Sequence, residues 1–113
     1  MALYYDLPVY KDTYKLILCI FQYTKDFSRE YKYTLGQDMK RDAMVLIRGI
    51  YRANKSQEKQ PYLEALLDDF ELLKLQIRLC HDLKLLNSKQ MAELAMLNES
   101  IGKQITAWKN KNS

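Results

Sequence analysis

Apolar residues recur along this chain at steps of three and four positions, interrupted by short polar segments. Such spacing places the apolar side chains on one face of an α-helix and is typical of helices that pack on a core. Four stretches carry the pattern, so we expect helices over roughly residues 8–25, 35–54, 58–86 and 89–109. The first begins at Pro8, which suits a first helical turn. Its expected core positions are Val9 or Tyr10, Tyr14, Ile17, and Ile20 or Phe21.

The second predicted helix follows a polar and aromatic linker, "DFSREYKY", and ends before the loop "NKSQEK". Thr34 stands three residues before Gln37. This is the spacing of a capping box, in which each side chain bonds the backbone N–H of the other residue. We therefore expect Thr34 to cap this helix. Its buried stripe is predicted at Met39, Ala43, Leu46 or Ile47, and Ile50.

The third predicted helix carries two apolar rows instead of one. The first row consists of Leu63, Leu66, Phe70, Leu73, Ile77 and Cys80. The second row lies on a different face and consists of Leu72, Leu75, Leu79, Leu83 and Leu86. Two such rows indicate either a central helix buried in its own bundle or a helix that packs on another subunit. We favour the second interpretation, because every helix of a four-helix bundle normally keeps a polar outer face.

The fourth predicted helix completes the fold, and Ser88 is expected to cap it. Asn98 falls on its core row, either as a buried polar group that fixes the register or as a boundary position. Together the patterns predict an all-α protein: an up-down four-helix bundle with short loops, forming one domain over residues 1–113 and assembling into a homo-oligomer. The apolar positions of the fourth helix are Met91, Leu94 or Ala95, Ile101, Ile105 and Trp108.

Composition narrows the possibilities further. The 113 residues include three glycines and two prolines, too few for the many tight turns of an all-β fold. The apolar stretch "LILCIF" is too short to span a membrane, and no signal peptide is recognisable, so we expect a cytoplasmic protein. Cys19 and Cys80 stand alone on apolar stretches and are expected to be reduced core residues. Their spacing alone leaves a disulfide between them open as the alternative.

Catalytic chemistry finds no support in the sequence. His81 is the single histidine, and its neighbours are Cys80 and Asp82. Adjacent residues on a helix point about 100° apart, so these side chains are not placed to form a nucleophile–base pair. Glu64 and Asp68 have the i,i+4 spacing, but no Glu-x-x-His motif accompanies them, and no glycine-rich phosphate loop is present. We therefore expect no enzyme, no metal site and no cofactor.

Basic residues form two short stripes in a chain whose net charge is +4, which favours a polyanionic partner. One stripe lies in the second helix and comprises Arg41, Arg48, Arg52 and Lys55. The other lies in the third helix and comprises Lys74, Arg78 and His81. Since the planar guanidinium group suits phosphate, the stripes indicate contact with a nucleic-acid backbone. Pairing of Arg48 or Arg52 with Asp68 and Asp69 inside the bundle is an equally weighted alternative.

Longer stretches resemble one known family. The segments "YKYTLGQDMKRDAMVLIRGIYRANK", "LKLQIRLCHDLKLLNSKQMAEL" and "IGKQITAWKNK" resemble the accessory variability determinant (Avd) proteins of diversity-generating retroelements, and "LPVYKDTYKLIL" agrees with them near the start. The resemblance implies a homopentameric ring of four-helix bundles with a basic surface and a central channel. It further implies no enzymatic activity. The implied partners are the reverse transcriptase of the retroelement and nucleic acid, during mutagenic copying of a template RNA into cDNA.

The resemblance also implies which side chains contact these partners. They are the basic positions within the matching segments: Lys40, Arg41, Arg48, Arg52, Lys74 and Arg78, with His81 and Lys84 as weaker candidates. The alternative is the wider group of four-helix-bundle proteins encoded in 23S ribosomal RNA intervening sequences, which is similar in fold but has no reverse-transcriptase partner. A neighbouring reverse-transcriptase gene would favour the first interpretation, and a location inside a ribosomal RNA gene the second.

Overall fold

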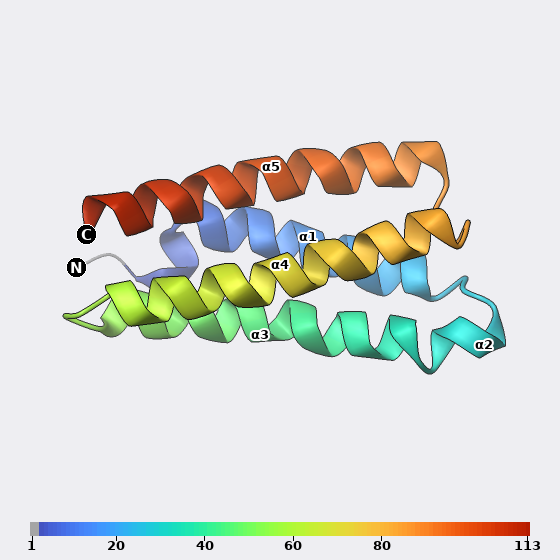
Figure 1. Ribbon diagram of the computed structural model, residues 1–113, viewed down its shortest axis with the longest axis horizontal. Coiled ribbons are helices and arrows are strands. Elements are labelled where there is room, and N and C mark those ends of the chain that lie inside the picture. The colour runs from blue at the N-terminus through green and yellow to red at the C-terminus, as the bar shows by residue number, and fades with distance from the viewer. Residues whose placement is uncertain (1–2) are drawn as a thin grey trace.

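The computed structural model describes residues 3–113, and all regular secondary structure in that range is helical, which confirms the predicted fold class. The four longest helices run alternately up and down in a bundle about 44 Å long and 23 by 21 Å across (Figure 1). In chain order the elements are η1 (Tyr4–Asp6), α1 (Pro8–Thr24), α2 (Arg29–Lys32), α3 (Leu35–Lys55), α4 (Gln60–Asp82) and α5 (Ser88–Lys111).

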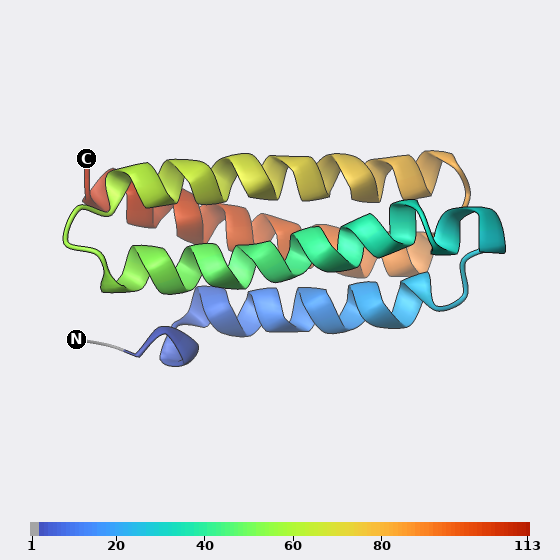
Figure 2. The same ribbon diagram turned by 90° about the horizontal axis from the view of Figure 1, so that it is seen from below.

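Each long helix packs against two others. Helix α1 contacts α3 and α5, and α4 also contacts α3 and α5. Figure 2 shows α1 and α3 side by side on one face, with α4 beyond α3. The order around the bundle is therefore α1, α3, α4, α5. It follows that the surface formed by α3 and α4 lies opposite the surface formed by α1 and α5.

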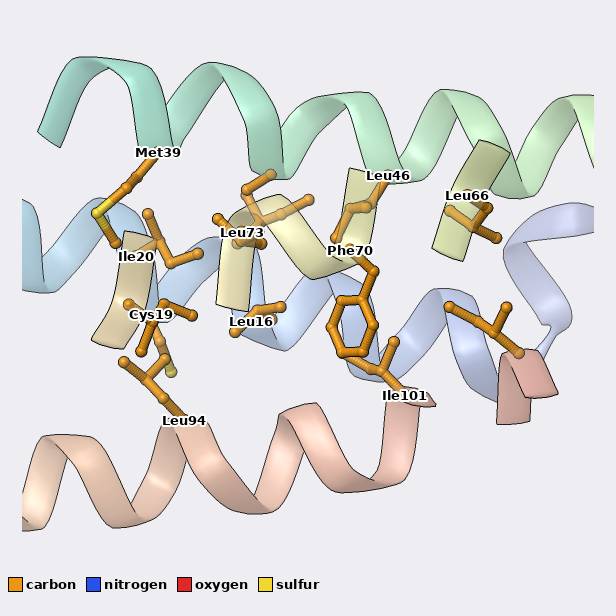
Figure 3. Close-up of a cluster of buried hydrophobic side chains, with 14 of the residues drawn as sticks. Leu16, Cys19, Ile20, Met39, Leu46, Leu66, Phe70, Leu73, Leu94 and Ile101 are labelled. Carbon is orange, nitrogen blue, oxygen red and sulfur yellow. The ribbon is translucent and has the colours of Figure 1, made fainter. Parts of the chain in front are cut away.

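The core runs along the axis of the bundle, with Phe70 of α4 near Leu46 of α3 and Ile101 of α5 (Figure 3). The first predicted row of α4 faces this core, and each of its members is at most 2% exposed. The α3 stripe is also buried as predicted, and Leu46 is the buried member of its Leu46/Ile47 pair. Both rows follow from the 3.6-residue repeat, which returns every third or fourth side chain to the same face.

The α1 stripe differs from the prediction at one position. Tyr14 was expected in the core but is 47% exposed, whereas Thr13 and Leu16 are fully buried. Of the two predicted alternatives at each end of the helix, Val9 and Ile20 are buried. The buried stripe therefore passes through Thr13 instead of Tyr14, and Tyr14 lies beside the stripe.

Thr34 stands at the N-cap position of α3 as predicted, but its predicted capping box does not form, and the predicted cap at Ser88 is wrong. The Thr34 hydroxyl donates to the Glu30 carbonyl at 2.8 Å, because the segment before it forms the short helix α2 and not an extended linker. Thr34 therefore makes no cap bond to α3. At the start of α5, the capping residue is Asn87 and not Ser88: Asn87 Oδ1 accepts from the Gln90 N–H at 2.8 Å, and Gln90 Oε1 accepts from the Asn87 N–H at 3.0 Å. Asparagine caps a helix as well as serine does.

Helix α4 ends at Asp82, four residues before the predicted end at residue 86. Lys84 adopts a left-handed backbone with φ of 61°. The Leu85 N–H then donates to the Cys80 carbonyl at 2.8 Å, and the Lys84 N–H donates to the His81 carbonyl at 3.0 Å. This is the Schellman arrangement, which usually carries glycine at the left-handed position. A lysine there gives no stop signal in the sequence, which explains the longer prediction.

Both cysteines are buried and free, as predicted. The Cys80 thiol lies 3.2 Å from the Met39 sulfur, and burial raises the pKa of this thiol to about 12. Asn98 is half buried, and its Oδ1 has no hydrogen-bond partner among residues 3–113. No helix in the described part of the chain is long and apolar enough to cross a membrane.

Candidate nucleic-acid and partner interface

The arginine row of α3 borders α4. Arg41, Arg48 and Arg52 are all exposed and follow one another at steps of seven and four. Arg48 and Arg52 line a shallow cavity together with Asp69 and Leu66 of α4, which places the row on the α3/α4 surface. Such a row presents its guanidinium groups to solvent from a rigid helix.

Intramolecular pairing does not account for this row. Within residues 3–113, Arg48 and Arg52 have no carboxylate within 4 Å, so the alternative in which Asp68 and Asp69 neutralise them is not found. Arg48 acts on Asp69 only at longer range: burial and the neighbouring Asp68 raise the pKa of the Asp69 carboxyl, and Arg48 lowers it. Arg41 does form ion pairs, 3.3 Å from Asp38 and 3.5 Å from Asp42, on the surface.

The outer leucine row of α4 continues along the same border, beyond the part that Arg48 and Arg52 line. Gln76 Nε2 donates to Asp42 Oδ2 of α3 at 2.7 Å, which fixes the side of α4 that borders α3. Leu72, Leu79 and Leu83 stand four residues before, three after and seven after Gln76, so they extend along the same border. Leu72, Leu75, Leu79 and Leu83 are between 42% and 55% exposed.

Leu86 departs from this row, because the chain turns inward after α4 and buries it to 6% exposure. The outer leucine row of α4 and the arginine row of α3 together form a mixed apolar and basic surface over the two helices. We call it the leucine–arginine face, and it consists of Leu72, Leu75, Leu79, Leu83, Arg41, Arg48 and Arg52.

The predicted basic stripe of α4 lies on another surface. Lys74 lines a groove with Gly102 and Lys103 of α5, and Arg78 and His81 follow Lys74 at four and seven residues. Arg78 is exposed, whereas Lys74 is partly covered. The outer leucines therefore separate the two predicted stripes, and the structure does not join them.

Each cation of the α4 stripe is paired within the bundle. Lys74 lies 2.6 Å from Glu71, and Arg78 lies 3.9 Å from Asp82. The imidazole Nδ1 of His81 is 3.5 Å from the same Asp82 carboxylate. Since the lysine and arginine pairs are on the surface, each of the two contributes about 0–1 kcal/mol and leaves its cation able to exchange partners.

The remaining predicted residues occupy two further places. Lys40 of α3 faces α1 and lies 5.6 Å from the centre of the Phe21 ring. Lys55 lies 4.7 Å from the centre of Tyr51 in its own helix and lines a cavity with Arg52 and with Tyr62 of α4. Lys84 is exposed in the turn after α4. The predicted set is thus divided among the α3/α4 border, the α5 side of α4, the α1/α3 face and one end of the bundle.

Sequence reasoning missed a groove of about 490 Å³ between α1 and α5. Its apolar lining is flanked by two carboxylates, and Lys15 also lines it. We call it the acidic groove, and its principal lining residues are Asp12, Leu18, Glu93, Met96 and Leu97. No signal in the sequence pairs these positions, because they come from helices at opposite ends of the chain.

Hydrogen bonds from neutral groups hold one carboxylate of the acidic groove. Asp12 Oδ2 accepts from Ser100 Oγ at 2.7 Å and from Gln104 Nε2 at 2.8 Å. Asp12 has no cationic partner within 4 Å among the residues that the structure describes. Its charge is thus held in place but not neutralised by an ion pair.

The second carboxylate of the groove is held in the same way. Glu93 Oε2 accepts from the Tyr23 hydroxyl at 2.7 Å, and Cys19 Sγ lies 3.6 Å from Glu93 Oε1. Burial, followed by the bond to Glu93, raises the pKa of the Tyr23 hydroxyl, so this donor keeps its proton. Burial also raises the pKa of the Cys19 thiol. Glu93 likewise forms no ion pair with any residue from 3 to 113.

The geometry places no catalytic pair around His81. Cys80 is fully buried while His81 is exposed, so the two side chains point into different environments. In the part of the chain that the structure covers, no three His, Cys, Asp or Glu side chains are grouped to hold a metal ion.

Comparisons with known proteins bear on the whole length of the bundle. A family model described as bAvd-like matches residues 8–112, from the first turn of α1 to the residue after α5. No curated protein and no solved structure matches the chain. Because the family match covers nearly every residue of the bundle, this chain belongs to the bAvd-like family, whose members are accessory proteins of diversity-generating retroelements.

Proposed function

We propose that this chain is a non-catalytic accessory subunit that binds a reverse transcriptase and nucleic acid while a diversity-generating retroelement copies its template RNA into mutated cDNA. It acts in the cytoplasm as a closed ring, of five subunits as the resemblance implies. The observation that carries the proposal is the leucine–arginine face. There, four exposed leucines lie along the same α3/α4 border as Arg48 and Arg52, two arginines that have no ion pair within residues 3–113.

Two surfaces of the bundle support ring assembly. A ring of more than two identical subunits needs two different, complementary patches on each chain. The leucine–arginine face and the acidic groove lie on opposite sides of the bundle. One offers a row of leucines flanked by free arginines, and the other an apolar groove flanked by carboxylates without a cationic partner. Contact between successive subunits would cover the leucines and leave Arg48 and Arg52, farther along the α3/α4 border, open to a polyanion.

The charge of the chain supports binding to a polyanion. Each chain carries a net charge of +4, so the positive charge of a ring grows with the number of its subunits. Contacts repeated around the ring add up through multivalency, even where each is weak. Such contacts go to phosphates, so binding should depend steeply on salt and little on base sequence.

Binding measurements across a salt series test this function directly. Labelled RNA is titrated with the wild-type protein and with the variant Arg48→Gln/Arg52→Gln at several salt concentrations. Each arginine that contacts a phosphate contributes about one unit to the slope of log K against log salt, so the variant should bind more weakly and with a shallower slope. A wild-type protein that binds no RNA, or binds it independently of salt, would contradict the nucleic-acid part of the proposal.

The matched control removes two charges elsewhere. The variant Arg29→Gln/Lys111→Gln loses the same net charge from exposed positions in α2 and at the end of α5. It should keep a binding constant and salt slope close to those of the wild type. Co-purification with a reverse transcriptase of a diversity-generating retroelement tests the protein partner. Absence of that complex at low salt would contradict this part alone.

A further inference from the structure

The surface between α1 and α3 carries a connected group of aromatic side chains. Tyr4 of η1 lies at its centre, with ring centroids 5.3, 5.5 and 5.1 Å from those of Tyr5, Tyr10 and Tyr51, each pair edge to face. Tyr10 in turn stacks near Tyr14 at 6.2 Å. These contacts tie η1, α1 and α3 together on the face that Figure 2 shows. Edge-to-face packing of this kind holds the rings in fixed orientations.

Much of this aromatic surface is open to solvent. Tyr5, Tyr14, Phe21 and Tyr51 are between 42% and 48% exposed. Single exposed aromatic residues are ordinary, but several exposed on one face are a feature of binding sites. We call the four exposed rings the aromatic face. None of them belongs to the leucine–arginine face or to the acidic groove.

Lysines lie over two of these rings. Lys55 Nζ is 4.7 Å from the centre of Tyr51, and Lys40 Nζ is 5.6 Å from the centre of Phe21. Neither lysine forms an ion pair with any described residue. Fifteen residues of α3 separate them, which is about 22 Å along the helix axis and matches roughly six stacked nucleotides.

We infer that the aromatic face is a binding site for single-stranded nucleic acid. Unpaired bases would stack on the sides of the Tyr14 and Phe21 rings that Tyr10 and Lys40 leave open, while Lys40 and Lys55 contact neighbouring phosphates. Stacking platforms combined with cations are the common chemistry of proteins that bind single strands without reading their sequence. A duplex offers no such faces, because its bases are already stacked on one another.

The placement of the lysines favours a nucleic acid over a protein partner. A protein that covered these rings would also have to cover Lys40 and Lys55, two charges that have no ion-pair partner among residues 3–113. A single strand instead supplies a flat apolar base and a negative phosphate at every nucleotide. The inference rests on the proposed nucleic-acid function and specifies its ligand as the unpaired form.

The test compares single-stranded and duplex RNA of equal length and at one salt concentration. The variant Tyr14→Ala/Phe21→Ala removes two rings, and Tyr14→Phe/Phe21→Tyr keeps both ring faces as its matched control. Removing a ring on which one base stacks should lower the affinity for the single strand roughly tenfold. The alanine variant should therefore bind a single strand of about 20 nucleotides roughly a hundredfold more weakly, while the control binds like the wild type. Affinity for the duplex should change little.

Three outcomes overturn the inference. They are an unchanged affinity of the alanine variant for the single strand, an equal loss on the duplex, and loss of a protein partner with single-strand binding intact. In these cases the proposed function stands if the wild-type protein still binds RNA in a salt-dependent way. A wild-type protein that binds neither single-stranded nor duplex RNA overturns both this inference and the proposed nucleic-acid function. Because both rings are about half exposed, far-ultraviolet circular dichroism should show the alanine variant folded.

Discussion

Helix α4 carries two rows of leucines that have the same chemistry and opposite environments. On the inner row, Leu66 and Leu73 are at most 1% exposed, whereas Leu75 and Leu79 on the outer row are 55% and 42% exposed. The rows are interleaved in the sequence, and only the 3.6-residue repeat of the helix separates them. Apolar character alone therefore does not say which leucines build the fold and which build a surface.

The neighbours of each row explain the difference. The inner row meets apolar side chains from three other helices (Figure 3). The outer row is open to solvent along the α3/α4 border, which Arg48 and Arg52 also line nearer the start of α4. Leucine beside arginine is the composition of a protein interface more than of a core, because interfaces keep arginine and exclude most other charges. The inner row should thus govern the stability of one chain, and the outer row the association of several.

The largest effect is expected from the inner row. Leu73→Ala removes a fully buried side chain and leaves a cavity between the helices, so it should lower the free energy of unfolding by about 2–5 kcal/mol. Urea denaturation at a fixed protein concentration measures this change. A loss below about 1 kcal/mol would mean that the centre of the core is loosely packed, and the contrast between the rows would lose its basis.

Leu86 sharpens the comparison, since it continues the outer row in the sequence but is 6% exposed in the structure. Leu86→Ala should lower the free energy of unfolding by about 2 kcal/mol, because the side chain is removed from apolar surroundings. Leu83→Ala, three residues earlier and 43% exposed, should change it by less than about 0.5 kcal/mol. Equal losses in thermal or urea unfolding would show that α4 extends past its observed end.

The sequence predicts the inner core well, because burial there follows a strict repeat over many residues. It predicts helix ends poorly. Lys84 takes a left-handed conformation that carries no glycine signal, and Thr34 bonds backward to Glu30 instead of capping α3. The Thr34 bond depends on the short helix α2 that precedes it, and the end of α4 depends on the backbone turn at Lys84. Local helix propensity contains neither piece of information.

The candidate site is only partly visible in the sequence. The steps between Arg41, Arg48 and Arg52 place them on one face of a helix, and the structure has them there. The acidic groove is not predictable in this way, because Asp12 and Ser100 are 88 positions apart in the chain. Only the packing of α1 on α5 brings them together. The structure likewise turns Lys40 toward Phe21 of α1, because α3 presents different faces to its two neighbours.

Charging the outer row should break assembly and leave the fold intact. Leu75→Glu/Leu79→Glu places two carboxylates in the proposed subunit contact, and light scattering should show the mass of a single chain. The free energy of unfolding of that chain should change by less than about 0.5 kcal/mol, because both side chains face solvent. Thr106→Glu/Asn110→Glu adds the same charge to exposed positions of α5 and should leave the ring whole. If the wild-type protein is already monomeric, the proposal that the outer row forms a subunit contact is wrong.

Asp69 provides the smallest and most specific test, since it stands between the two rows, three residues after Leu66 and three before Leu72. Burial and the nearby Asp68 hold the pKa of its carboxyl above the ordinary 3.8, despite the opposing effect of Arg48. The folded chain therefore binds this proton more tightly than the unfolded chain does. The stabilisation from that proton is fully present below pH 3.8 and is lost as the pH rises through the raised pKa.

Asparagine does not titrate, so Asp69→Asn should be slightly more stable than the wild type at about pH 7, and the gain should disappear below pH 3.8. Urea midpoints at both pH values measure the difference, and Glu58→Gln, at an exposed position outside this border, controls for the change in net charge. A gain that persists at low pH would show that the introduced amide packs better for reasons other than charge. A loss at neutral pH would mean that Arg48 depends on the carboxylate, and the arginines of the outer face would then be held by the bundle and not free for a partner.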